Sequence, residues 1–408
     1  MITKIEKLEV LKEDRKKISR NYLYSQIIKN ERHKRKLTLQ EMAHGICSIS
    51  YLCKLEKNAI VADESFIKAI FERINLDYDK VGLNIIANGV EQAIKAYLYQ
   101  NYQEITNLYE MIDDSLFNVQ NYLLKGFYYL INEKYQSFKE IMATINNIKD
   151  TMLKEDVGVF MFQVIAYYLK TYQFKTAYKY LKYIENIDFD NRELNWLLYE
   201  QHYICAYNLK IYPMFYRYYC LLMENYNIGY PSSRQIIIRL MMLDVEAIEY
   251  FEEIAGDVRN IASEEHDYAA HFDIIYWKLL ILLRGKMWFE VYEEIIDKGL
   301  FGEARFIALL LYAVDKMKRA EYINKAVEIA ENYIFESNES IHQVFISFIL
   351  LKFKTEKKYT LVEHLRFKVM PFNKNYTHHL YNKIYEKHYV DYLCKTSKYK
   401  EALSYCRV

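Results

Sequence analysis

Residues 37–58, which read LTLQEMAHGICSISYLCKLEKN, decide the fold of the N-terminal part of this chain. Thr38 and Glu41 have the spacing of a capping box, in which the hydroxyl accepts from the N3 amide and the carboxylate accepts from the N-cap amide. Gly45 stands where the first helix must stop and turn, because glycine tolerates the left-handed conformation that ends a helix. A second helix start follows the turn. The stretch therefore predicts a helix-turn-helix.

The second helix, which starts at Ser48 or Ile49, has two distinct faces. Leu52 and Leu55 point inward at helical spacing. In a helix-turn-helix that binds DNA, the second helix lies in the major groove and its outward side chains contact the bases. We therefore expect four outward side chains to contact DNA: Ile49, Ser50, Tyr51 and Lys54.

The charge of the chain is divided unevenly. The whole chain has a formal net charge of +1, but residues 1–60 hold 14 Lys and Arg against 7 Asp and Glu, and residues 61–408 hold 41 against 47. A basic segment gains affinity for DNA because it neutralises phosphates and releases counterions. In the run Arg32–Lys36, we expect Arg35 and Lys36 to contact phosphates. The alternative is a solvated helix end, where cations are favoured by the helix dipole.

The sequence of residues 45–56, Gly-Ile-Cys-Ser-x-Ser-Tyr-Leu-x-Lys-Leu-Glu, resembles that of the DNA-binding domain of peptide-pheromone transcription regulators of the Rgg and RNPP type. In that family the domain is of the XRE class. The resemblance implies a first helix at about residues 24–36 and a fourth helix at about residues 63–74. It also implies an architectural ion pair between Arg32 and Glu56.

Two positions depart from the pattern of the family. The family usually has Gln directly after the Thr of the capping box, whereas this chain has Leu39 there and Gln40 one position later. We take Gln40 as a further candidate contact to DNA. Ile49 occupies a base-facing position that is often polar in the family, so we expect it to contact a thymine methyl group rather than donate a hydrogen bond.

The remainder of the chain has the composition of an all-α protein. The chain has only 3 Pro and 10 Gly, so few helices are interrupted, and its 42 Tyr and 21 Phe fall at helical spacing. Short polar hinges such as Lys170–Lys175 separate pairs of helices. Several hinges recur roughly 30 to 42 residues apart, close to the ~34 residues of a tetratricopeptide repeat. We expect a right-handed α-solenoid of tetratricopeptide-like helical hairpins.

These observations predict four segments along the chain. Residues 1–20 form an N-terminal extension, 21–76 the helix-turn-helix domain, 77–90 a linker that carries Gly82, and 91–408 the solenoid. The length of 408 residues agrees with this division, because it exceeds what one hydrophobic core usually serves.

A solenoid presents a long concave surface that suits a peptide or a protein segment. In the family that this chain resembles, Asn side chains on the inner helices hold the backbone of a short signalling peptide, since an amide pairs with both N–H and C=O groups. The corresponding candidates, on the first helix of each hairpin, are Asn121, Gln163, Asn195, Gln201 and Asn208. The alternative for each is an ordinary exposed amide.

Other classes of protein have little support in the sequence. The six cysteines include no Cys-x-x-Cys pair, and the adjacent His378 and His379 would point about 100° apart on a helix, so we expect no metal site. No phosphate-binding loop, zinc-protease motif or nucleophile elbow occurs, so we expect neither an enzyme nor a cofactor. The N-terminus does not read as a signal peptide, and no apolar run reaches the ~18 residues of a membrane span. We expect a cytoplasmic protein without a membrane partner.

The leading interpretation is a dimeric transcription regulator. Its helix-turn-helix domain binds a double-stranded DNA operator, and its solenoid supplies the homodimer interface and senses an intracellular signalling peptide, as the resemblance to quorum-sensing regulators implies. Two alternatives stay open. One is an interaction scaffold whose DNA-binding domain only anchors it, and the other is a phage-type repressor that needs no ligand.

Overall fold

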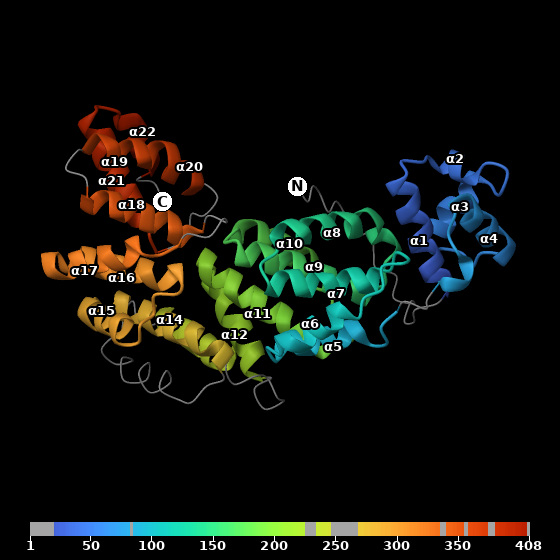
Figure 1. The fold of residues 1–408 in the computed structure, drawn as a ribbon, viewed down its shortest axis with the longest axis horizontal. Helices are drawn as coiled ribbons and strands as arrows, with labels where there is room; N and C mark the ends of the chain where they lie inside the picture. The colour runs from blue at the N-terminus through green and yellow to red at the C-terminus, as the bar shows by residue number, and fades with distance from the viewer. Residues whose placement is uncertain are drawn as a thin grey trace. The chain divides into compact units, whose positions relative to one another are not determined.

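The computed structural model describes residues 20–81, 85–224, 234–245, 268–334, 340–354, 358–373 and 380–405. Within these ranges the chain consists of helices and connecting turns without any strand, so the protein is all-α (Figure 1). Residues 1–19, Gly82, His378 and His379, for which the sequence makes predictions, lie outside the described residues. The chain forms two compact units, the first comprising residues 1–170 and 175–205 and the second comprising residues 171–174 and 206–408.

The first unit begins with a small helical segment, residues 20–81, which we call the head. Its helices are α1 (Arg20–Lys34), α2 (Leu39–Ala43), α3 (Ile49–Glu56) and α4 (Glu64–Arg73), followed by the 3-10 turn η1 (Tyr78–Lys80). Helices α1 and α2 each pack against both α3 and α4. The side chains that fill the space between them are fully buried: Ile28, Met42, Leu52, Leu55 and Ile70.

The head differs from its sequence-based description at both ends. The first helix, expected at about residues 24–36, begins earlier and ends at Lys34. The linker expected at residues 77–90 is partly inside the head, because the Tyr78 ring stacks on Tyr24 with 5.2 Å between ring centroids and Val81 is buried. A single aromatic residue that packs against α1 therefore extends the head to residue 81.

The rest of the first unit, residues 85–170 and 175–205, is called the body here. Its elements are α5 (Gly89–Leu98), α6 (Tyr102–Glu110), α7 (Val119–Ile131), α8 (Tyr135–Ile148), η2 (Lys149–Thr151), α9 (Lys154–Lys170), α10 (Phe174–Ile184) and most of α11 (Arg192–Leu209). Helix α7 packs against α8, the helix that follows it, and also against α5 and α9 (Figure 1). Successive helical hairpins are thus stacked side by side through their first helices.

The second unit continues with helical hairpins. Its elements are α12 (Tyr212–Glu224), a helical stretch at residues 234–245, α14 (Tyr268–Arg284), α15 (Trp288–Asp297), α16 (Ala304–Met317), α17 (Ala320–Glu331), α18 (Ile341–Lys354), α19 (Lys358–His364), the π-helical turn η4 (Leu365–Val369), α20 (Met370–Asn373), α21 (Asn382–Lys395) and α22 (Tyr399–Tyr405). Helix α16 packs against α15 and α17 and also against α14 and α18. The same stacking of first helices therefore recurs in this unit.

One backbone feature repeats at the hinges of the hairpins. Just beyond the end of the first helix, a residue other than glycine adopts the left-handed conformation, with φ between 54° and 62°: Gln100, Glu133, Tyr172, Lys210, Lys286, Lys318 and Ser397. This conformation ends a helix by turning the chain back on itself, at a steric cost that glycine would avoid. The polar hinges expected from the sequence lie at these turns.

Candidate nucleic-acid interface

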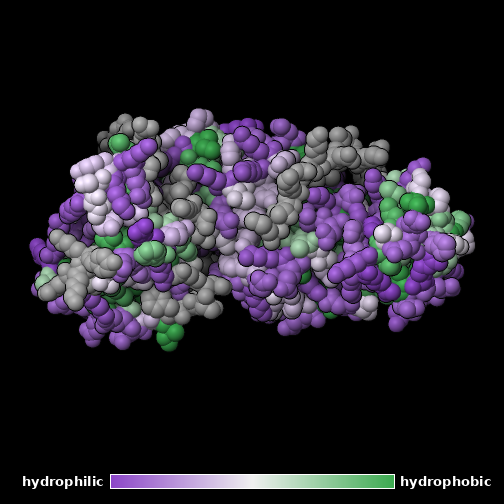
Figure 2. All heavy atoms as spheres, turned by 90° about the horizontal axis from the view of Figure 1, so that it is seen from above, coloured by the Kyte–Doolittle hydropathy of each residue, from purple (hydrophilic) through white to green (hydrophobic). Residues whose placement is uncertain are grey.

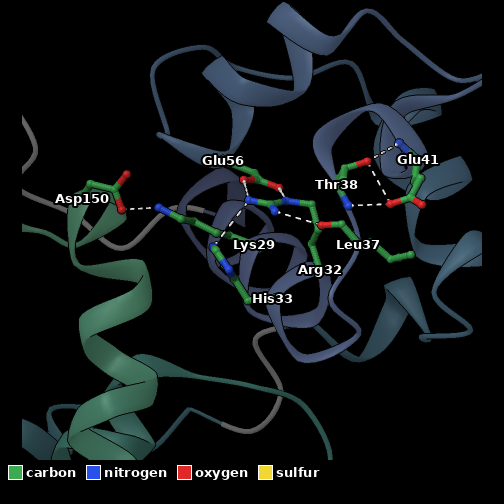
Figure 3. A network of polar contacts seen from close by, with 8 residues as sticks. All are labelled: Lys29, Arg32, His33, Leu37, Thr38, Glu41, Glu56 and Asp150. Carbon is green, nitrogen blue, oxygen red and sulfur yellow. Dashed lines mark hydrogen bonds and ion pairs between the residues drawn. The ribbon is translucent and has the colours of Figure 1, made fainter. Parts of the chain in front are cut away.

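The turn between α2 and α3 has the local geometry that its residues predict. The Glu41 amide donates to Thr38 Oγ1 at 3.2 Å, and the Thr38 amide donates to Glu41 Oε2 at 2.7 Å, so both halves of the capping box are present (Figure 3). The hydrogen bonds that the Thr38 amide and hydroxyl donate to the carboxylate lower the pKa of Glu41. Gly45 has a φ of +70° in the turn, and Ser48 Oγ caps α3 by accepting from the Tyr51 amide at 3.1 Å.

Helix α3 shows one buried and one exposed face. Leu52 and Leu55 are fully buried, whereas Ser50 and Lys54 are exposed and the Ile49 side chain is 47% exposed. Figure 2 shows hydrophobic side chains, coloured green, among hydrophilic ones on the surface of the head at the right of the view. The face of α3 that contains Ile49 is therefore open to a partner.

Tyr51 differs from the other residues expected on this face. Its hydroxyl oxygen accepts from the Asp63 amide at 2.9 Å, and its ring lies against Phe66 with 5.2 Å between centroids. The side chain is half-buried and spans the start of α4. Because the hydroxyl is used as an acceptor, its proton can still be donated to an oxygen outside the protein. Tyr51 is thus held in one orientation and is half-buried, unlike the exposed Ser50 and Lys54.

The ion pair implied for Arg32 and Glu56 is present. Arg32 Nε donates to Glu56 Oε1 at 2.6 Å and Arg32 Nη2 donates to Glu56 Oε2 at 2.8 Å, while Nη1 donates to the Leu37 carbonyl at 3.1 Å (Figure 3). The two side chains are only 13% and 5% exposed. Hydrogen bonding to Glu56 raises the pKa of the Arg32 guanidinium. A bidentate pair of this kind fixes both position and angle, so it ties the end of α3 to α1.

The basic residues beside α2 have unequal freedom. Arg35 Nη2 donates to the Ile74 carbonyl at 2.5 Å, and Arg35 Nε donates to Glu31 at 3.3 Å, so most of this guanidinium is used inside the head. Lys36 and Gln40 are exposed. The structure therefore leaves Lys36 and Gln40 available to a partner, whereas Arg35 stabilises the C-terminal end of α4.

Arg73 is a structural residue of this surface that the sequence does not reveal. Its Nη1 donates to the Met42 carbonyl at 2.9 Å and thereby caps the C-terminal end of α2. From the sequence, Arg73 reads only as a cation in the last turn of its own helix, since nothing local indicates that α2 ends beside it.

The amides expected to hold a peptide are used mainly inside the fold. Gln163 Nε2 donates to the Leu123 carbonyl at 2.7 Å, and Gln201 Nε2 donates to the Phe162 carbonyl at 2.9 Å, so each joins a first helix to the first helix before it. Both side chains are buried. A Cβ at Gly126 would lie 2.4 Å from Gln163 Oε1, so glycine makes room for this contact.

The remaining candidate amides lie at loops and helix ends. Asn121 is buried and donates to the Asp113 carbonyl at 3.1 Å. Asn195 donates to the Phe189 carbonyl at 2.7 Å and accepts from the Phe189 amide at 3.3 Å. Asn208 is half-buried in the last turn of α11. The amide nitrogens of four of the five candidates thus donate to backbone carbonyls inside the fold, and peptide binding by this group stays a prediction: Asn121, Gln163, Asn195 and Gln201.

Metal sites and membrane-spanning helices are two other features that the described residues do not show. Within the described residues, no group of three or more His, Cys, Asp and Glu side chains is placed to hold a metal ion. Among the helices in the described part of the chain, none combines the length and the apolar character that crossing a membrane requires.

Comparison with known proteins gives one distant relative. The chain is 25% identical over 182 residues to the transcriptional activator NprA of Geobacillus stearothermophilus, a match that covers 40% of this chain and 43% of that protein. The matched region thus spans less than half the length of the relative. No protein-family model matches the chain, and no solved structure does.

Proposed function

We propose that this protein is a DNA-binding transcription regulator and that α2 and α3 form a helix-turn-helix whose second helix lies in the major groove. The observation that carries the proposal is the exposed face of α3, where Ile49, Ser50 and Lys54 stand open on a helix that is otherwise anchored by its N-cap and by the Arg32–Glu56 pair. A rigid helix with a free outer face is what base recognition requires. The similarity to a transcriptional activator agrees with this role.

Each side chain of this surface contacts a specific part of the DNA in this proposal. Ile49 contacts a thymine methyl group, and Ser50 hydrogen-bonds a base edge, since a hydroxyl can donate or accept. Lys54, Lys36 and Gln40 contact the phosphate backbone. Tyr51 donates its remaining hydroxyl proton to a phosphate oxygen, because the Asp63 amide already holds the hydroxyl in place.

We further propose that the helical hairpins form a right-handed tetratricopeptide-like solenoid that dimerises and senses a signalling peptide. The stacking of first helices and the repeated left-handed hinge residues support the repeat. The resemblance of residues 45–56 to Rgg and RNPP regulators supports the peptide. Since internal contacts occupy most of the candidate amides, the peptide would contact other side chains of the concave surface. No catalytic activity is proposed.

The DNA-binding role is tested with the full chain. Random duplexes are selected for binding, and affinity for the selected duplex is measured at several salt concentrations. Lys54→Ala should weaken binding to selected and random duplexes alike and lower the salt slope by about 1, whereas Ser50→Ala should relax base preference by ~1–3 kcal/mol at one position. Lys68→Ala is the matched control, because Lys68 is an exposed lysine of the head on α4 and not on α3.

If both α3 variants bind as the wild type does, α3 does not read DNA. The peptide is tested separately by mass spectrometry of the protein purified from its native host. A protein that binds DNA but carries and needs no peptide would favour the ligand-independent repressor. A protein without DNA affinity that retains another protein would favour the interaction scaffold.

A further inference from the structure

The middle of helix α1 is buried on every side. The eight consecutive residues from Tyr22 to Lys29 are all buried, although a helix at the edge of a small domain normally keeps one polar stripe in water. One side of α1 packs inside the head, where Tyr24 meets Phe71 and Tyr78 and where Ile28 is fully buried. The other side must therefore be covered by something outside the head.

The covered stripe is polar and its cover is the body. Tyr22, Ser25, Gln26 and Lys29 follow one another at the spacing of a single helical face. All four are buried, and α1 packs against α8 and η2 of the body. The sequence of this stripe is that of a solvent-exposed face, but in the described part of the chain the body packs against it.

The centre of the contact is a buried carboxylate. Tyr22 donates its hydroxyl proton to Asp156 Oδ2, and Gln120 Nε2 donates to Asp156 Oδ1 at 2.5 Å. The Leu153 amide in turn donates to the Tyr22 hydroxyl at 3.4 Å. Tyr22 and Asp156 are 1% and 5% exposed, so this hydrogen-bonded chain from α1 to α7 and α9 is shielded from water.

An ion pair lies at the edge of the same contact. Lys29 Nζ pairs with Asp150 Oδ1 of η2, and the two side chains are 9% and 49% exposed (Figure 3). The Lys29 ammonium therefore reaches from a buried stem toward a carboxylate that is partly in water. An ion pair and a hydrogen-bonded carboxylate are directional, so together they hold α1 at one angle. Apolar packing alone would tolerate sliding and rotation.

We propose that this stripe of α1 is a positioning surface that fixes the head on the body and thereby sets the spacing of the two DNA half-sites that a dimer accepts. The inference rests on the proposed function. Two-fold related heads meet equivalent major grooves only when the half-sites are about one helical turn, ~34 Å, or a multiple of it apart. A shift by half a turn places the second half-site on the opposite side of the duplex, out of reach of a head that cannot move.

The test measures the affinity of the full-length protein for two copies of its selected half-site separated by spacers of different length. Wild type should prefer its best spacing over one shifted by ~5 base pairs by about tenfold or more. Asp150→Lys places two cations together and should reduce this preference to less than about threefold, while affinity for a single half-site stays within about twofold of wild type. The charge-swapped double variant Lys29→Asp with Asp150→Lys should restore the preference.

Two other variants separate positioning from general effects. Asp297→Lys makes the same charge change at an exposed position of α15 in the second unit and should behave as wild type. Tyr22→Phe removes only the hydroxyl that reaches Asp156 and should reduce the spacing preference without any change of charge.

Three outcomes would contradict the proposal. Asp150→Lys could retain the spacing preference of the wild type, the charge swap could fail to restore it, or wild type could show no preference at all; each would mean that this contact does not position the head. A wild-type protein that selects no duplex would instead refute the proposed DNA binding, and the inference would fall with it.

Discussion

Removal of the Glu56 carboxylate should selectively loosen the head. In Glu56→Ala, Arg32 loses both of its hydrogen bonds to the carboxylate, at 2.6 and 2.8 Å, and keeps its bond to the Leu37 carbonyl and its 3.5 Å contact with the His33 ring. Breaking a buried ion pair costs about 3–5 kcal/mol when the remaining charge is fully buried. Because the Arg32 side chain is 13% exposed and keeps its bond to the Leu37 carbonyl, we expect about 3 kcal/mol, near the low end of that range.

The assay is hydrogen exchange of the full-length protein followed by mass spectrometry of its peptides. A loss of about 3 kcal/mol increases the open population of α1 and α3 by roughly a hundredfold, and their amides exchange faster by the same factor. The three tryptophans, Trp196, Trp277 and Trp288, all lie outside the head, so their fluorescence on denaturation reports the remainder of the chain and should not change.

A matched control is Glu64→Ala on α4. Glu64 pairs with Lys68 one helical turn away, and both side chains are more than half exposed, so its loss should leave exchange in the head nearly unaltered. If α1 and α3 exchange in Glu56→Ala at the wild-type rate, the pair does not stabilise the head and the reasoning from its burial is refuted. Equal acceleration in Glu64→Ala would show that the effect is not specific to the buried pair.

Three further predictions concern the remainder of the chain. Lys318→Gly should stabilise the second unit by about 0.5–1 kcal/mol, because Lys318 has a φ of 58° and glycine adopts this left-handed conformation without steric cost. Urea unfolding measures the change. Lys316→Gly is the control and should destabilise the same unit, because Lys316 lies within α16 and glycine is unfavourable inside a helix. Gly126→Ala should destabilise the first unit by about 1–3 kcal/mol in the same assay, because its Cβ would lie 2.4 Å from Gln163 Oε1, and an unchanged midpoint would mean that the helices separate easily. Burial raises the pKa of Asp156 to about 6, above its ordinary value of 3.8, so stability is greatest where this carboxyl is protonated and falls as the pH rises through 6. Between pH 4.5 and 7.5, wild type should lose about 2 kcal/mol relative to Asp156→Asn, and parallel pH profiles of the two proteins would contradict this.

Local signals in the sequence were sufficient for the elements that form through near neighbours. The Thr38–Glu41 capping box, the glycine turn at Gly45 and the N-cap at Ser48 involve groups only a few residues apart, so their residue types alone dictate the geometry. The inward spacing of Leu52 and Leu55 is local for the same reason. The recurring hinges and the all-α composition likewise follow from short-range preferences along the chain.

The tertiary structure alone decided which polar side chains are free. Tyr51 reads as an outward residue of α3, but the Asp63 amide reaches it across the head. Gln163 reads as an exposed amide on an inner helix, but its Nε2 donates to the carbonyl of Leu123, 40 residues earlier in the chain.

The polar stripe of α1 shows most clearly that the sequence does not reveal which polar side chains are buried. Tyr22 and Lys29 have the spacing and the polarity of a solvated face, yet their partners Asp156 and Asp150 stand 134 and 121 residues further along the chain. A buried polar group needs a hydrogen-bond partner, but the sequence does not indicate which distant residue becomes that partner in the folded chain. The sequence by itself therefore determined the helices, the caps and the two faces of α3. The meeting of α1 with the body depended on long-range packing, because only the assembled helices decide which polar stripe leaves water.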